Sequence, residues 1–147
     1  MQKKKKKIVV GLIEKITIMG KHPVKTLALF DTGANISSVD TRLASKARLG
    51  PIVKTQRVKN PSFKQQTTRP VVNAKVKIKN HIFETEVNIQ DRSHMTFPVI
   101  IGRNVSVGNF IVDPAKNLEL FKKMQGINNE QRMQGQKKLK HFIDERL

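Results

Sequence analysis

Alternation of apolar and polar residues along positions 72–89 is the feature that most limits what this chain can fold into. Apolar residues occupy every second position from Val72 to Ile78, and Phe83, Thr85, Val87 and Ile89 form a second run with the same period. The residues between them are mostly Lys in the first run and Glu in the second. A period of two places one face of each strand against a core and the other in solvent. The pattern therefore predicts an antiparallel hairpin that turns near Asn80-His81.

The rest of the chain up to position 112 consists of short β-rich runs separated by turn residues, which predicts a mainly β domain. The clearest of these runs are Ile8-Val9-Val10, Ile16-Thr17-Ile18 and Val24 to Phe30. Helix signals are brief: Asp40 or Thr41 can cap a turn that reaches Lys46, and Asn104 to Val107 can form another.

Three segments follow from this pattern. Residues 1–7 form a basic N-terminal arm that contains the run Lys3 to Lys7, and residues 8–115 form the β domain. Residues 116–147 are predicted to be a basic helical extension, because Leu118, Phe121 and Met124 recur at helical spacing.

Composition excludes several classes of chemistry. The 147 residues include 29 Lys and Arg against 11 Asp and Glu, so the net charge of +18 favours acidic or polyanionic partners. The absence of cysteine excludes disulfides and thiolate metal sites. The four histidines form no His-Glu-x-x-His motif, and no glycine-rich phosphate loop occurs, so we expect neither a metal nor another cofactor. No apolar run is long enough to span a bilayer, and we expect a soluble, cytoplasmic protein without a membrane partner.

The segment Phe30-Asp31-Thr32-Gly33-Ala34 is the strongest candidate for a reactive centre. An apolar strand leads directly into the carboxylate of Asp31, so the strand would hold that group rigidly and exclude water on one side. Thr32 supplies a hydroxyl, and Gly33 lets backbone approach closely. Taken alone, the same residues also suit an ordinary turn.

A second segment, Val99-Ile100-Ile101-Gly102-Arg103-Asn104, has the same form of a buried strand that ends at a glycine. The two segments together resemble the signature elements of retropepsins, the single-lobe aspartic proteases of retroviruses. The resemblance is closest to a group of archaeal and bacterial proteins whose family name is ATP-dependent zinc protease. That group has a similar Asp-Thr-Gly-Ala with a nearby Ser, here Ser37, and a later segment like Asp91 to Arg103.

This resemblance implies a single-lobe closed β-barrel over residues 8–115 and an aspartic peptidase that needs no metal. Such an enzyme requires two facing carboxylates that share a proton. Because the chain holds one Asp-Thr-Gly and has no room for a second lobe, we expect a homodimer in which each copy supplies Asp31.

The resemblance also implies supporting roles around the catalytic loop of Thr32, Gly33 and Ala34. Ile101 and Gly102 would support the loop from the second segment. In retropepsins the residue at the position of Arg103 pairs with an acid just after the loop, but Asn35 stands there in this chain. Arg103 would therefore make a neutral hydrogen bond to Asn35 or find another acid.

Lys59 to Arg69 corresponds to the glycine-rich flap of retropepsins, yet this stretch contains no glycine. The leading hypothesis is a dimeric aspartic endopeptidase whose basic charge would suit acidic or glutamate-rich peptides. The alternative is an inactive protease scaffold that binds nucleic acid or the ribosome through its charge. The absence of Tyr and Trp gives such a protein few side chains for base stacking.

Overall fold

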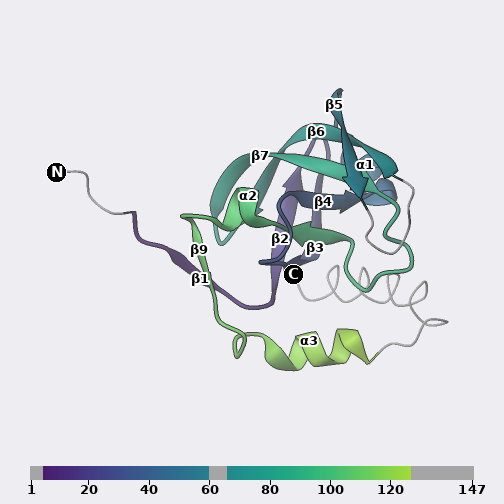
Figure 1. Cartoon of the computed structure of the whole chain (residues 1–147). Coiled ribbons are helices and arrows are strands. Elements are labelled where there is room, and N and C mark those ends of the chain that lie inside the picture. Colours follow the sequence, from purple (N-terminus) through teal and green to yellow (C-terminus); the bar gives the residue numbers. More distant parts are fainter. Residues whose placement is uncertain (1–4, 60–65, 127–147) are drawn as a thin grey trace.

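The computed structural model describes residues 5–59 and 66–126, and strands dominate this part of the chain as predicted (Figure 1). The strands are β1 (Ile8–Val10), β2 (Ile13–Met19), β3 (Pro23–Phe30), β4 (Ser37–Asp40), β5 (Ile52–Lys59), β6 (Gln66–Ile78), β7 (His81–Gln90), β8 (Val99–Ile101) and β9 (Phe110–Val112). The helices are α1 (Thr41–Ala47), α2 (Arg103–Ser106) and α3 (Leu118–Gln125). No helix within these residues is long and apolar enough to cross a membrane.

Six strands close into a barrel in the order β2-β3-β8-β4-β7-β6, and β6 returns to pair with β2. The strand β8 lies between β3, to which it is parallel, and β4, to which it is antiparallel. The strand β5 pairs with another part of β6, and β1 and β9 form a separate parallel pair. The expected closed β-barrel is therefore present.

The hairpin formed by β6 and β7 confirms the alternation prediction. Val76 lies opposite Phe83, and Lys75 faces Glu84 with an Nζ to Oε1 distance of 3.4 Å. The turn lies one residue earlier than predicted, because Lys79 and Asn80 adopt positive φ angles of 50° and 65°. Two consecutive residues in this backbone region are what a two-residue hairpin turn requires.

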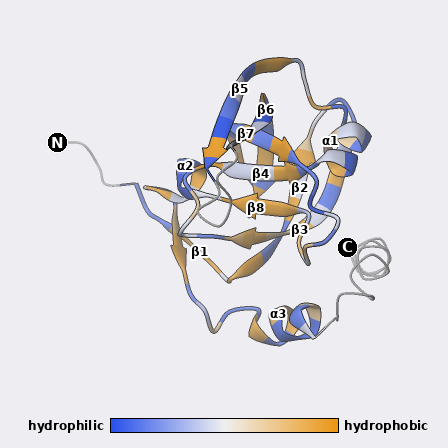
Figure 2. Ribbon diagram, turned by 45° about the vertical axis from the view of Figure 1, so that its right-hand side comes forward, coloured by the Kyte–Doolittle hydropathy of each residue, from blue (hydrophilic) through white to orange (hydrophobic). Residues whose placement is uncertain are grey.

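Apolar residues fill the barrel and a second, smaller cluster beneath α3. Figure 2 shows the central strand β8 coloured as hydrophobic along its length, and both of its ends are buried. The second cluster contains Ile13, Leu27 and Phe97, against which α3 packs Leu120, Phe121 and Met124. The helix thus lies within the predicted helical segment and covers the outside of β2 and β3. Residues 127–147 of that segment, like residues 1–4 of the predicted arm, lie outside the described residues.

A buried carboxylate fastens the start of α3 to the barrel. Glu14 is only 4% exposed, and its Oε2 accepts hydrogen bonds from the Gly11 amide at 2.9 Å and from Asn117 Nδ2 at 2.8 Å. Its Oε1 lies 3.0 Å from Lys79 Nζ in the hairpin turn. This hydrogen bond, more than any other factor, raises the pKa of Lys79. A single side chain therefore joins β2, the β6–β7 turn and the residue that precedes α3.

Candidate active site

Asp31 lies immediately after β3, at the point where this strand leaves the barrel. Phe30 is the last residue of β3 and lies opposite Ile101 of β8. The Asp31 amide continues this parallel pairing by donating to the Ile101 carbonyl oxygen at 2.9 Å. Its side-chain Oδ1 accepts a hydrogen bond from the Gly33 amide at 2.9 Å. The carboxylate is thus oriented by the loop, while Thr32 and Gly33 remain exposed.

The loop of residues 31–36 is clasped by the start of α2. The Arg103 amide donates to the Ala34 carbonyl oxygen at 2.8 Å, and the Asn104 amide donates to that of Asn35 at 3.2 Å. Gly102 allows this approach, since a Cβ at this position would lie 2.7 Å from the carbonyl carbon of Ile36. Backbone atoms on both sides leave no space for a side chain, which explains the glycine in physical terms.

The sequence left two possible partners for Arg103, and the structure shows the first of them, the uncharged side chain of Asn35. Arg103 Nη2 donates to Asn35 Oδ1, and its Nη1 donates to the Thr32 carbonyl oxygen at 2.9 Å. The guanidinium therefore braces two points of the Asp31 loop from outside. The structure brings together all eight residues that the sequence singled out, which are Asp31, Thr32, Gly33, Ala34, Asn35, Ile101, Gly102 and Arg103.

A hydrogen-bonded pair beneath the loop was missed by sequence reasoning. Ser37 Oγ donates to Asn104 Oδ1 at 2.9 Å and accepts from the Gly102 amide at 2.9 Å. Asn104 Nδ2 in turn donates to Thr85 Oγ1 at 2.8 Å, which ties the site to β7. Both residues belong to the segments that carry the family resemblance, so their positions were flagged, but no local pattern indicates that they bond to each other.

Arg92 is a buried cation near this centre that was also missed. It is 4% exposed, its Nε donates to the Phe97 carbonyl oxygen at 2.9 Å, and its amide donates to Asp40 Oδ1 at 2.8 Å. Burial lowers the pKa of Arg92 to about 10, while the charges of Asp40 and Asp31 oppose this shift and that of Arg69 on β6 adds to it. Arg92 thus stays charged at neutral pH and lies within electrostatic range of Asp31.

Of the predicted flap, Lys59 to Arg69, the structure describes Lys59 at the end of β5 and Gln66 to Arg69 at the start of β6, and these two strands pair with each other. Residues 60–65 lie outside the described residues. The pair is held over the barrel by side chains, since Asn88 Nδ2 on β7 donates to Gln56 Oε1 on β5 at 3.0 Å. Asn88 Oδ1 also accepts from Ser38 Oγ of β4 at 2.6 Å. A chain of polar side chains therefore connects β5, through Asn88, to the strand that follows the Asp31 loop.

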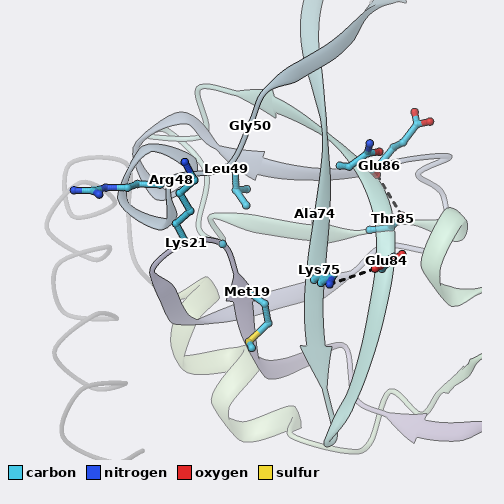
Figure 3. Close-up of a pocket in the computed structure, with 12 residues that line it drawn as sticks. Met19, Lys21, Arg48, Leu49, Gly50, Ala74, Lys75, Glu84, Thr85 and Glu86 are labelled. Atoms are coloured by element: carbon cyan, nitrogen blue, oxygen red, sulfur yellow. Dashed lines mark hydrogen bonds and ion pairs between the residues drawn. The ribbon is translucent and has the colours of Figure 1, made fainter.

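A cavity of about 740 Å³ lies apart from these residues, between the end of α1 and the β6–β7 hairpin (Figure 3). It is lined by segments 19–21, 48–50, 73–75 and 84–86 and contains none of the predicted site residues. One edge of β6 pairs with β5 as far as Val72 and with β2 from Val76, so residues 73–75 face neither strand. Figure 3 shows Lys75 directed at Glu84 beside this break.

Within residues 5–59 and 66–126, no three His, Asp or Glu side chains come together as a metal site would require. The described site offers one carboxylate, that of Asp31, which backbone hydrogen bonds hold at the start of its loop. Such a group can take a proton from water when a second acid faces it.

The barrel and the clasped Asp-Thr-Gly loop define a retropepsin-like aspartic protease fold. A Legionella pneumophila protein of unknown function matches it with a TM-score of 0.50 and 22% identity, over 73% of this chain and 93% of that one. The EIAV protease, solved with the inhibitor HBY-793, matches with a TM-score of 0.51 and 18% identity, over 69% of this chain and 91% of that one. No curated protein matches the sequence.

The particular family is identified by a sequence model. Residues 40–120 match the RimB-like family, described as retropepsin-like aspartic endopeptidase RimB, and the chain belongs to this family. The matched segment includes β8, the Gly102-Arg103-Asn104 turn and the first three residues of α3. It begins after Asp31, so the family match does not include that residue.

Proposed function

We propose that the protein is an aspartic endopeptidase that works as a homodimer, with Asp31 of both copies holding the attacking water. The observation that carries this proposal is the form of the site. Asp31 is fixed by backbone hydrogen bonds at the end of a buried strand, as a catalytic acid must be. Yet among the described residues it contacts no second carboxylate.

The proposed reaction requires that second acid. Two carboxylates about 3 Å apart share one proton, because both cannot be ionised at that distance. The ionised group takes a proton from water, and the resulting hydroxide attacks the peptide carbonyl carbon. The protonated group hydrogen-bonds to the carbonyl oxygen, and a proton is then delivered to the nitrogen as the C–N bond breaks. One Asp31 from each copy would complete this pair.

The surface around the site supports self-association. Val107, at the end of α2, is 73% exposed, and Val9 and Ile111 are both exposed register partners on β1 and β9. The helix α2 joins this apolar surface directly to the Asp31 loop through Arg103. Exposed apolar residues gathered in this way are typical of protein interfaces. A second copy that covers them would also lie next to Thr32 and Gly33.

Mixing experiments test whether the two copies share one site. Asp31→Asn should fold and dimerise normally but lack peptidase activity. If wild type and this variant are mixed in equal amounts and pair at random, about one quarter of the dimers keep both carboxylates. Activity should therefore follow the square of the wild-type fraction. A linear dependence, or activity in the pure variant, would contradict the proposed mechanism.

The interface has its own test by sedimentation. Val107→Asp should raise the dimer dissociation constant, because it buries a charge in the proposed interface. Ile52→Asp is the matched control, since Ile52 is 62% exposed at the start of β5, a strand that pairs only with β6. Equal effects of the two substitutions, or a monomeric wild type with full activity, would exclude this interface.

For the substrate, we propose acidic peptides, including glutamate-rich ones. The net charge of +18 supports this choice, and Arg92 adds a positive charge within electrostatic range of Asp31. Cleavage of a glutamate-rich peptide should exceed that of a lysine-rich peptide of equal length in kcat/KM, and added salt should reduce the difference. The reverse preference would exclude an acidic substrate while leaving the catalytic proposal intact.

A further inference from the structure

A groove of about 540 Å³ runs along the outer face of β3, β2 and β6, beside α3 and outside the proposed active site. Thr17 of β2 lies at its centre, opposite Lys25 on one neighbouring strand and Lys77 on the other. Lys15 lies two residues earlier on β2, and side chains two residues apart point to the same face of a strand. Lys79, in the hairpin turn, completes the set of cations.

The positive charge of this groove is largely uncompensated. Its lining contains four lysines and one acid, Glu14, which is an excess of three positive charges (4 − 1). Glu14 is buried and already paired with Lys79. Lys15, Lys25 and Lys77 are exposed and form no ion pair with any residue that the structure describes. The groove therefore presents three free ammonium groups to solvent.

Gathering these charges on one face opposes folding. Lys25 and Lys77 are two strand spacings apart, about 10 Å, which is within the screening length of a 0.1 M salt solution. Like charges held on neighbouring strands are destabilising. A bound anion that bridges the strands would remove this repulsion.

We propose that this groove binds the phosphate backbone of a nucleic acid. The cations are all lysines, whose compact ammonium charges bind phosphate oxygens without the planar geometry that an arginine fork requires. The hydroxyl of Thr17 lies between them as a further donor. The lining contains no aromatic side chain, so bases have nothing to stack on and binding will not depend on sequence.

This inference goes beyond the proposed peptidase and does not depend on Asp31. The test uses the full chain and a fluorescein-labelled oligouridylate, with binding followed by anisotropy at a series of KCl concentrations. The groove variant carries Lys15→Gln, Lys25→Gln and Lys77→Gln. The matched control carries Lys21→Gln, Lys59→Gln and Lys123→Gln, which make the same charge change at exposed positions outside the groove.

Each lysine that contacts a phosphate of single-stranded RNA contributes about 0.7 to the slope of log K against log salt. The groove variant should therefore lose about 2 from this slope, and its affinity at 0.1 M KCl should fall at least about tenfold. The control should lose clearly less, and Asp31→Asn should bind RNA as the wild type does. Unchanged far-UV circular dichroism would show that the groove variant remains folded.

Two results would overturn the inference. Equal losses in the groove variant and in the control would mean that the overall charge, and not this groove, attracts RNA. If poly-glutamate displaces the RNA at equal charge concentration and itself binds more tightly through the same lysines, the groove is a site for acidic protein segments instead.

Discussion

Replacing Glu14 by Ala should be among the most destabilising single substitutions in this chain. The carboxylate is buried, and its Oε2 accepts two hydrogen bonds, from the Gly11 amide and from Asn117. A hydrogen bond to a charged group contributes about 1.5–3 kcal/mol. The substitution leaves the Gly11 amide without an acceptor, whereas Asn117 Nδ2 keeps its bond to the Ile13 carbonyl oxygen. The ion pair with Lys79, which is more than one third exposed, adds little. We expect the free energy of unfolding to fall by about 3–5 kcal/mol.

Urea unfolding followed by far-UV circular dichroism measures this loss, since the chain has neither Trp nor Tyr for fluorescence. Protein concentration must be held constant, because dimerisation is linked to stability. Glu14→Gln keeps one acceptor oxygen and should cost roughly half as much as Glu14→Ala. Lys79→Met should cost less than about 1 kcal/mol. A loss below about 1 kcal/mol in Glu14→Ala, or equal losses in Glu14→Ala and Lys79→Met, would refute the assignment of Glu14 as the anchor of α3.

Three further outcomes are expected. Ser37→Ala removes the acceptor for the Gly102 amide and should lower the free energy of unfolding by about 1–3 kcal/mol in the same urea assay, whereas an unchanged midpoint would mean that water replaces the hydroxyl. Gly102→Ala should abolish peptidase activity, because its Cβ would displace the backbone at Ile36, and a retained kcat/KM would contradict the clasp described here. Because its pKa is raised, protonated Lys79 stabilises the fold fully below its unfolded pKa of 10.5, and this stabilisation is lost as pH rises through the folded pKa. The melting temperature should fall over that pH range, and an equal fall in Glu14→Gln would mean that groups other than the Lys79–Glu14 pair cause it.

Local pattern was enough to predict the strands and the reactive segment. The alternation from Val72 to Ile89 needs only a period of two, and the strand that leads into Asp31 ends in four apolar residues, Leu27 to Phe30. The sequence placed the hairpin turn one residue late. Asparagine adopts the left-handed backbone region more readily than lysine does, yet Lys79 adopts it here together with Asn80. In α3, Phe121 and Met124 pack as their spacing predicted, but Leu120 joins them in place of Leu118.

Long-range contacts were beyond the reach of the sequence. Ser37 and Asn104 are 67 residues apart, and Asp40 and Arg92 are 52 apart, and each pair meets only because barrel closure brings their strands together. A side-chain hydrogen bond imposes no periodicity on a sequence, so neither pair leaves a local signal. The adjacency of the Asp31 loop and Gly102 was anticipated only through the family resemblance.

One edge of β6 pairs with β5 near its start and with β2 near its end. This shared edge divides the sheet into a closed ring of six strands and one strand outside the ring, β5. The ring is closed by the contact of β6 with β2, whereas β5 adds to β6 alone and closes nothing. The contacts of β5 with β7 are the hydrogen bond from Asn88 to Gln56 and the ion pair of Lys54 with Glu86, whose atoms are 2.6 Å apart. The closure of the ring that positions Asp31 therefore does not depend on β5 or on these two contacts.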